Sequence, residues 1–176
     1  MDLRDIVVGD AHNWSWERPL SDISYIAIHH SATSPSATPQ EIAKYHVEKN
    51  SWGGIGYHFV ISKEGTVFYV GDISTARANV ANMNEKVLGI CLIGNFTRGQ
   101  SPTVIQLDSC KKLIDFLINY KDLISLNGWN CVKAHREFPR QSTICPGDNW
   151  QSWFKILTAS KPTFLNSYSV GLPAKP

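Results

Sequence analysis

The sequence lacks features of several protein classes. It has no apolar run of the about 18 residues that a membrane-spanning helix needs, so it predicts no membrane insertion. Its start, MDLRDIVVGD, has charges within the first five positions and no apolar signal-peptide core, so we expect synthesis without a signal peptide in the cytoplasm, where thiols stay reduced. The net charge of +2 and the pI of about 8.3 are too mild to indicate a nucleic-acid partner.

Two metal-binding and redox motifs are also missing. There is no CxxC pair, which argues against a zinc finger or a thioredoxin-like site, and no HExxH helix of a metalloprotease. Among the four cysteines, Cys91, Cys110 and Cys131 lie in apolar surroundings and are predicted to be buried side chains. Cys145 differs, because it lies among the turn-forming residues of STICPGDNW, where a thiol has no core to fill.

The chain of 176 residues, 43% hydrophobic and 18% charged, is typical of one globular domain. Interspersed helices and strands with one tight hairpin predict an α/β fold: a single domain with a mixed central β-sheet flanked by helices. We expect this domain to extend over 1–160 and a tail or linker to follow over 161–176. The predicted strands are 24–30, 57–62, 66–70, 88–94 and 131–134, and the predicted helices end near 50, 120 and 157.

Helix-start signals refine these boundaries. Thr38, Pro39 and Glu41 form a capping-box pattern with proline in the first turn. Ser101-Pro102 is predicted to open the second helix, and Asp148 to cap the third.

Two segments have no clear periodicity. Residues 1–22 form an irregular lead-in whose Trp14, Trp16 and Pro19 we expect to pack over the domain. Residues 71–86 read as a long loop, and such loops in compact domains are often functional, so this loop is predicted to wall a cleft.

The stretch YIAIHHSAT places two histidines where an apolar strand ends. Neighbouring side chains of a strand point to opposite faces, so one metal ion cannot easily take both. Three candidate ligands lie at the ends of elements: His29 or His30, His135, and Cys145. A catalytic zinc uses about three such ligands. From spacing alone, the alternative is a hydrogen-bonded histidine on each strand and a free cysteine in a turn.

Five motifs in order, IAIHHSAT, SWGGIGYHFVIS, LGICLIGNF, AHREF and ICPGD, resemble the type-2 N-acetylmuramoyl-L-alanine amidase family. This family includes phage amidase endolysins and peptidoglycan recognition proteins. The resemblance extends from about residue 23 to 158 and implies the fold of that family.

The resemblance also implies a Zn²⁺ site with ligands His29, His135 and Cys145, which leaves His30 packed or hydrogen-bonded on the opposite face. The implied reaction is hydrolysis of the amide between N-acetylmuramic acid and L-alanine, in which zinc lowers the pKa of bound water to about 7. Tyr57 matches the tyrosine that the family places at the zinc. Thr143 lies where some phage members carry lysine, and its hydroxyl can donate to the oxyanion without adding charge.

Candidate substrate-binding residues follow from the same resemblance. Arg77 stands where many relatives have histidine and is expected either to bind a substrate carboxylate or to be solvated. Asn79 and Asn95 are further groove candidates, and Asn95 follows a strand end. Trp52 is expected either to line the groove or to pack in the core.

The leading hypothesis is therefore a zinc amidase that cuts peptidoglycan as a phage or prophage endolysin, reaching the cell wall after the membrane is breached. We expect a monomer whose tail leads towards a wall-binding domain. The alternative is a recognition module that binds muramyl peptides without cutting them, which the presence of Cys145 disfavours. A cytoplasmic amidase that recycles wall fragments usually has aspartate at the cysteine position.

Overall fold

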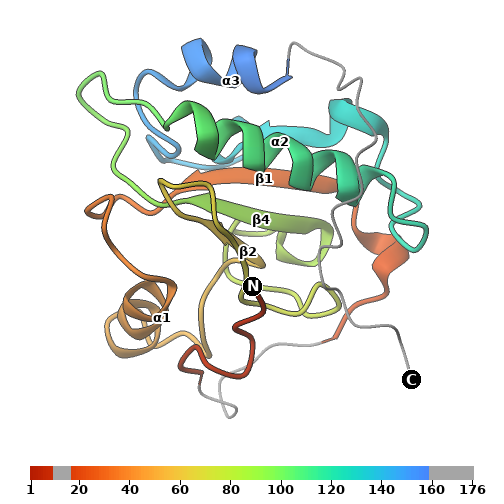
Figure 1. The fold of residues 1–176 in the computed structure, drawn as a ribbon. Helices are drawn as coiled ribbons and strands as arrows, with labels where there is room; N and C mark the ends of the chain where they lie inside the picture. The colour runs from red at the N-terminus through yellow and green to blue at the C-terminus, as the bar shows by residue number, and fades with distance from the viewer. Residues whose placement is uncertain (10–16, 159–176) are drawn as a thin grey trace.

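A five-stranded sheet forms the centre of the protein (Figure 1). The structure is a computed structural model that describes residues 1–9 and 17–158. The sheet is mixed, because β1 runs parallel to β4 and β5, while β2 runs parallel to β4 and antiparallel to β3. In spatial order the strands are β3 (Val67–Tyr69), β2 (Phe59–Ile61), β4 (Val87–Leu92), β1 (Tyr25–His30) and β5 (Val132–Ala134).

The helices lie on both faces of this sheet. Helices α2 (Val104–Ile118) and α3 (Trp150–Thr158) lie on one face, and α1 (Pro39–Glu48) lies on the other (Figure 1). This confirms the predicted fold class of an α/β domain with a mixed sheet flanked by helices. In the described residues, no helix is long and apolar enough to cross a membrane.

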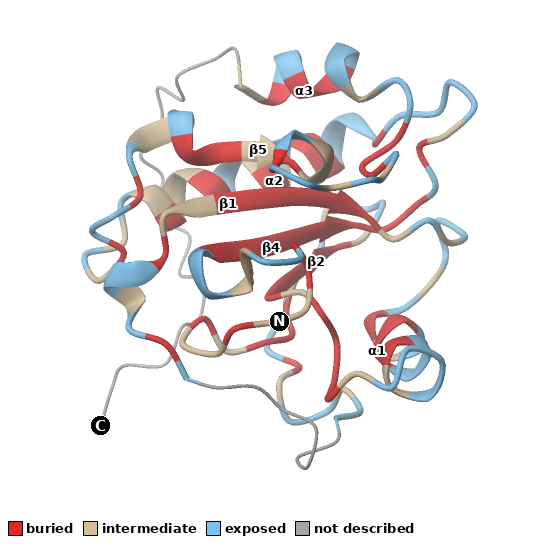
Figure 2. Ribbon diagram, turned by 180° about the vertical axis from the view of Figure 1, so that it is seen from behind, coloured by how far each residue is buried: buried red, intermediate tan, exposed pale blue. Residues whose placement is uncertain are grey.

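Alternate residues along a strand pack into two separate hydrophobic cores, one on each face of the sheet. Phe59 and Ile61 of β2 join the large core beneath α2 and α3, whereas Val60 packs with Ile42 of α1 and with Cys91 of β4. The central strands are therefore buried along almost their whole length (Figure 2). This alternation leaves His29 and Cys91, which are register partners, side by side on the α1 face.

Helix starts follow local capping chemistry. The capping box of α1 is confirmed, with the Thr38 side chain accepting from the Glu41 backbone N–H. The second helix begins later than predicted, because Thr103 rather than Ser101 caps it by accepting from the Gln106 N–H. Asp148 does not cap α3: its carboxylate accepts from the Arg98 N–H.

The loop over 71–86 is held to the sheet by a buried arginine. Arg18, 5% exposed, donates to the carbonyls of Ile73, Asn84 and Val87. Pro19, predicted to pack over the domain, is instead exposed, because it is Arg18 beside it that enters the interior. The predictions for Trp14, Trp16 and the tail at 161–176 lie outside the described residues.

Candidate metal centre

Two parallel strands bring His29 and His135 together. Ile28 of β1 is the register partner of Ala134, the last residue of β5. The residue that follows each of them in the chain is a histidine, so the two imidazoles lie side by side, with ring centroids 4.6 Å apart. The strand ends therefore converge as the sequence predicts.

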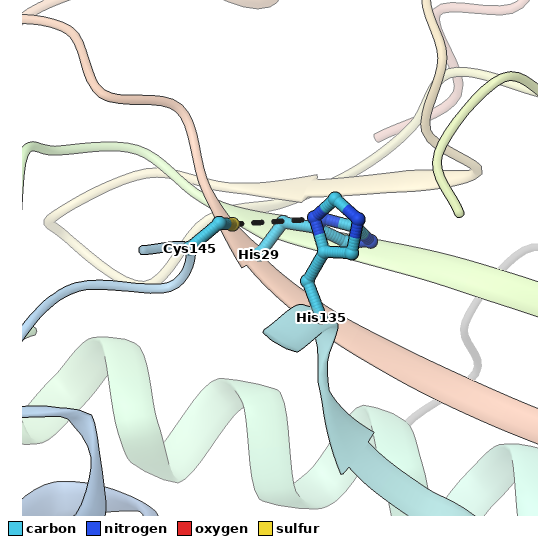
Figure 3. Close-up of side chains that lie close together, drawn as sticks. All are labelled: His29, His135 and Cys145. Carbon is cyan, nitrogen blue, oxygen red and sulfur yellow. Dashed lines mark hydrogen bonds between the residues drawn. The ribbon is translucent and has the colours of Figure 1, made fainter. Parts of the chain in front are cut away.

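The turn before α3 completes the group. Cys145 Sγ lies 3.7 Å from His29 Nδ1 (Figure 3). One donor atom from each of His29, His135 and Cys145 lies within 4.8 Å of the other two. Gly147 lets this turn approach the sheet, because its φ of +127° suits glycine and a Cβ there would collide with the Phe96 carbonyl. The three predicted ligands thus converge from β1, from the end of β5 and from this turn.

The residues present fit zinc. Two imidazole nitrogens and one sulfur are the donor types of catalytic zinc centres, which leave the fourth position open. Ligand atoms of a tetrahedral ion with bonds of about 2.0–2.3 Å lie roughly 3.5 Å apart, close to the Sγ–Nδ1 separation of 3.7 Å here.

Burial keeps these groups uncharged in the protein alone. It holds the pKa of His29 well below its usual range, with His135 adding repulsion, and it also lowers the pKa of His135. Burial raises the pKa of the Cys145 thiol to about 12. A cation would reverse this preference at the thiol, because it stabilises the thiolate that coordinates it.

Tyr57 and Thr143 border the three predicted ligands. The ring of Tyr57, just before β2, lies 5.1 Å from the His29 ring between centroids, and burial raises the pKa of its hydroxyl well above its usual range. Thr143 Oγ1 accepts from the Cys145 N–H at 3.1 Å, so this hydroxyl shapes the cysteine turn. Its own proton remains free for another acceptor.

Comparison with known proteins agrees with this geometry. The N-acetylmuramoyl-L-alanine amidase family model matches residues 19–148. The chain belongs to this family. Peptidoglycan-recognition protein SC2 of Drosophila melanogaster is 30% identical over 145 residues, covering 74% of this chain and 76% of that protein. The endolysin of Escherichia phage T7 is 28% identical over 142 residues, covering 74% and 84%.

Solved structures of amidases share the fold. The N-acetylmuramoyl-L-alanine amidase LysC from Clostridium intestinale URNW matches with a TM-score of 0.67 and 29% identity, covering 84% of this chain and 92% of that one. The amidase family thus accounts for the sheet, the flanking helices and the order of the motifs.

The groove candidates of this amidase-family chain occupy different environments. Asn95 is exposed after β4, and its Oδ1 accepts from the Thr97 N–H and hydroxyl. Trp52 is half-buried with its ring centroid 4.6 Å from that of His46. Arg77 is half-buried rather than fully solvated, and its Nη1 donates to the Ile55 carbonyl. Substrate contacts of all three remain predictions.

Asn79 lies nearer the metal-binding group than its groove assignment implies. It is 7% exposed, and its Oδ1, like the Nε2 of His29, is buried without a hydrogen-bond partner among the described residues. Gln141 has a similar place beside His135, with Oε1 3.2 Å from Nε2. Sequence reasoning missed Gln141, and its only signal was its position between two predicted ligands.

His30 has the structural role that was predicted for it. It is 6% exposed, its Nδ1 accepts from the Phe96 N–H at 3.1 Å, and burial lowers its pKa to about 4. The neighbouring histidines thus point to different faces: His29 lies with His135 and Cys145, and His30 packs within the domain.

Proposed function

We propose that this protein is a zinc-dependent N-acetylmuramoyl-L-alanine amidase that hydrolyses the amide between N-acetylmuramic acid and L-alanine in peptidoglycan. The convergence of His29, His135 and Cys145 carries the proposal, since three such donors within 4.8 Å form the protein part of a catalytic zinc site. The family model and the relatives named above support the substrate class.

In this mechanism the chain supplies the ligands and a hydrogen-bond donor. His29 and His135 bind as neutral imidazoles and Cys145 as a thiolate. A bound zinc ion supplies Lewis-acid chemistry, polarising a carbonyl and bringing the pKa of water to about 7. The end of β5, strand β1 and the cysteine turn would hold the ion through these three donors, and a fourth position would be open to the substrate.

Tyr57 stabilises the negative charge that develops on the scissile carbonyl oxygen. Its raised pKa keeps the hydroxyl proton on the oxygen, and a protonated hydroxyl beside the metal ligands donates a hydrogen bond. The free proton of the Thr143 hydroxyl serves as a second donor. Because neither group is charged, this pair contributes less electrostatic stabilisation than a lysine at position 143.

The biological role we propose is that of an endolysin of a phage or prophage. Phage endolysins are among the relatives, with T7 endolysin at 28% identity and the endolysin of Enterobacteria phage T3 at 27%. Addition of the protein to bacteria with a permeabilised outer layer should then lower culture turbidity, and loss of amidase activity should remove this effect.

A non-catalytic peptidoglycan-binding module is the second candidate. It is favoured by the 30% identity to a protein named as a peptidoglycan-recognition protein. The presence of all three donors distinguishes the two candidates, because binding alone does not require them.

Digestion of purified peptidoglycan tests the proposal. New amino groups on alanine are scored against new reducing sugar ends, before and after chelation and after zinc is restored. An amidase releases amines but no reducing ends, loses activity on chelation and regains it with zinc. Protein that pellets with the wall but releases no amines supports the binding module instead.

A further inference from the structure

Each of the two histidine ligands has a side-chain amide on its outer side. The amide oxygen of Gln141 faces His135 Nε2 at 3.2 Å. Asn79, in the long loop, has a buried amide oxygen with no hydrogen-bond partner in the described part of the chain, and Nε2 of His29 is buried and unpartnered there as well. An imidazole that binds a metal through one nitrogen carries its proton on the other, and a partner of that N–H fixes the tautomer.

The orientation of the Gln141 amide is set by its own donors. Nε2 of Gln141 donates to the carbonyls of Ala81 and Pro139, at 3.0 and 3.1 Å. The amide oxygen is therefore the atom that faces His135, and an oxygen can only accept. The His135 Nε2 must then carry the proton, which leaves Nδ1 for the metal.

The Asn79 amide is fixed in the same way. Its Nδ2 donates to the Arg77 carbonyl at 2.7 Å, so Oδ1 is the free end. Within the described residues, Asn79 Oδ1 and His29 Nε2 are both buried and neither has a partner within hydrogen-bond distance, so each is open to the other. The amide oxygen favours a protonated ring nitrogen, and His29 Nδ1 is the nitrogen that faces Cys145 Sγ.

Glycine makes room for this arrangement. A Cβ on Gly89 of β4 would lie 3.0 Å from both Cγ and Oδ1 of Asn79. The backbone N–H of Asn79 also donates to Asn84 Oδ1 at 3.0 Å, which holds the loop behind it. The amide is thus pressed between the sheet and its own loop.

We propose that Asn79 and Gln141 are positioning residues that select the Nε2–H tautomer of His29 and His135 and so direct both Nδ1 atoms at the metal. Both amides are tied to the 71–86 loop, Asn79 by sequence and Gln141 through the Ala81 carbonyl. This loop is therefore the outer support of the metal centre. The metal part of the inference rests on the proposed zinc site, but the tautomers are a property of the chain itself.

The tautomers can be measured in the metal-free protein. A long-range ¹H–¹⁵N correlation spectrum of ¹⁵N-labelled protein shows which nitrogen of each imidazole bears the proton, and His29→Gln and His135→Gln assign the signals. We expect Nε2–H for both rings. A proton on Nδ1 of either ring overturns the inference, whatever the protein does with zinc.

Zinc affinity, measured by competition with a chromophoric chelator, tests the consequence for the ligands. Asn79→Leu and Gln141→Leu should each weaken zinc binding by about 10–100-fold, the usual effect of removing such a partner. Asn79→Asp and Gln141→Glu keep an acceptor oxygen and should restore most of that affinity. Equal losses in the leucine and acidic variants overturn the positioning role.

Asn84→Ala is the matched control, because Asn84 holds the same loop through the N–H groups of Asn79 and Val80 but does not touch either imidazole. It should weaken zinc binding much less than Asn79→Leu does. A loss as large as that of Asn79→Leu would mean that loop order alone is responsible. A protein with the expected tautomers and zinc affinity that releases no alanine amines contradicts the amidase proposal and leaves this inference standing.

Discussion

Cys145 Sγ lies 3.7 Å from His29 Nδ1, although 116 positions separate the two residues in the chain. The thiol occupies a turn that is anchored at both sides: the Arg136 N–H donates to the Cys145 carbonyl, and the Cys145 N–H donates to Thr143. Backbone contacts therefore set the position of this turn, so a substitution of the thiol should leave the turn in place.

Cys145→Ser should remove zinc and cleavage while the fold persists. A serine hydroxyl is a weaker zinc ligand than a thiolate, so we expect amine release to fall by more than the about 100-fold that loss of an outer partner costs. Amine release and bound zinc, measured on the same preparation, check this. Unchanged activity would remove Cys145 from the site.

Cys131→Ser is the matched control. Cys131 is also buried, but its Sγ donates to the Gly128 carbonyl at 2.9 Å, a hydrogen bond that a serine hydroxyl can replace. This variant should retain zinc and activity.

His30→Ala should cost stability rather than metal. It leaves the buried Phe96 N–H without its acceptor, which costs about 1–3 kcal/mol, and it opens a cavity beside the Phe96 ring. Urea unfolding should show the loss, while zinc still binds. His29→Ala should instead abolish zinc binding. If His30→Ala loses zinc while His29→Ala keeps it, His30 is the ligand and the assignment of His29 is wrong.

The order of elements could be predicted because it depends on local sequence. The capping box of Thr38 and Glu41 needs only residues three apart. For the three candidate ligands, the residues alone left His29 and His30 as alternatives, and the family resemblance selected His29. Parallel neighbours end at the same edge of a sheet, which is why His29 and His135 lie together.

The residues that hold the candidate site and its loop in place could not be predicted in this way. Arg18 binds backbone carbonyls more than fifty positions away, and any residue type at those positions would offer the same acceptor. Gln141 and Asn79 lie in segments without periodicity, where polar residues are ordinary. Their roles depend on which atom of each amide is already occupied, and only the folded structure shows that.

Gly89→Ala should disturb the candidate metal centre through the Asn79 amide, which packs against Gly89. The new Cβ must push the Asn79 amide by a few tenths of an ångström, so zinc affinity should fall, though by less than in Asn79→Leu. Overpacking of this kind also costs about 1–3 kcal/mol of unfolding free energy. Zinc competition and urea unfolding measure the two effects.

A double variant tests whether Gly89 acts on the site through Asn79. In an Asn79→Ala background the two contacts at 3.0 Å are gone and only the Cβ of residue 79, at 3.2 Å, is left, so Gly89→Ala should cause a smaller further loss of zinc affinity than it does alone. Fully additive losses would show that Gly89 acts on the site by another route.

The stability of the protein should fall as the pH drops from about 6.5 to about 4, and His46 should contribute to that fall. Burial lowers the pKa of His46 to about 4, while the unfolded chain has the ordinary value near 6.5. Between these values the unfolded state binds more protons than the folded state, so the free energy of unfolding rises with pH. The contribution is complete above about 6.5 and is on the order of 3 kcal/mol.

His46→Asn isolates this contribution. The His46 Nδ1 accepts from the Gly56 N–H at 3.0 Å, and the amide oxygen of asparagine can take over that role without titrating. Urea unfolding from pH 7 to pH 4 should therefore give a shallower decline in the variant, with the remaining slope due to other buried histidines such as His30 and His58. Identical slopes in both proteins would mean that His46 is protonated in the folded state as readily as in the unfolded chain.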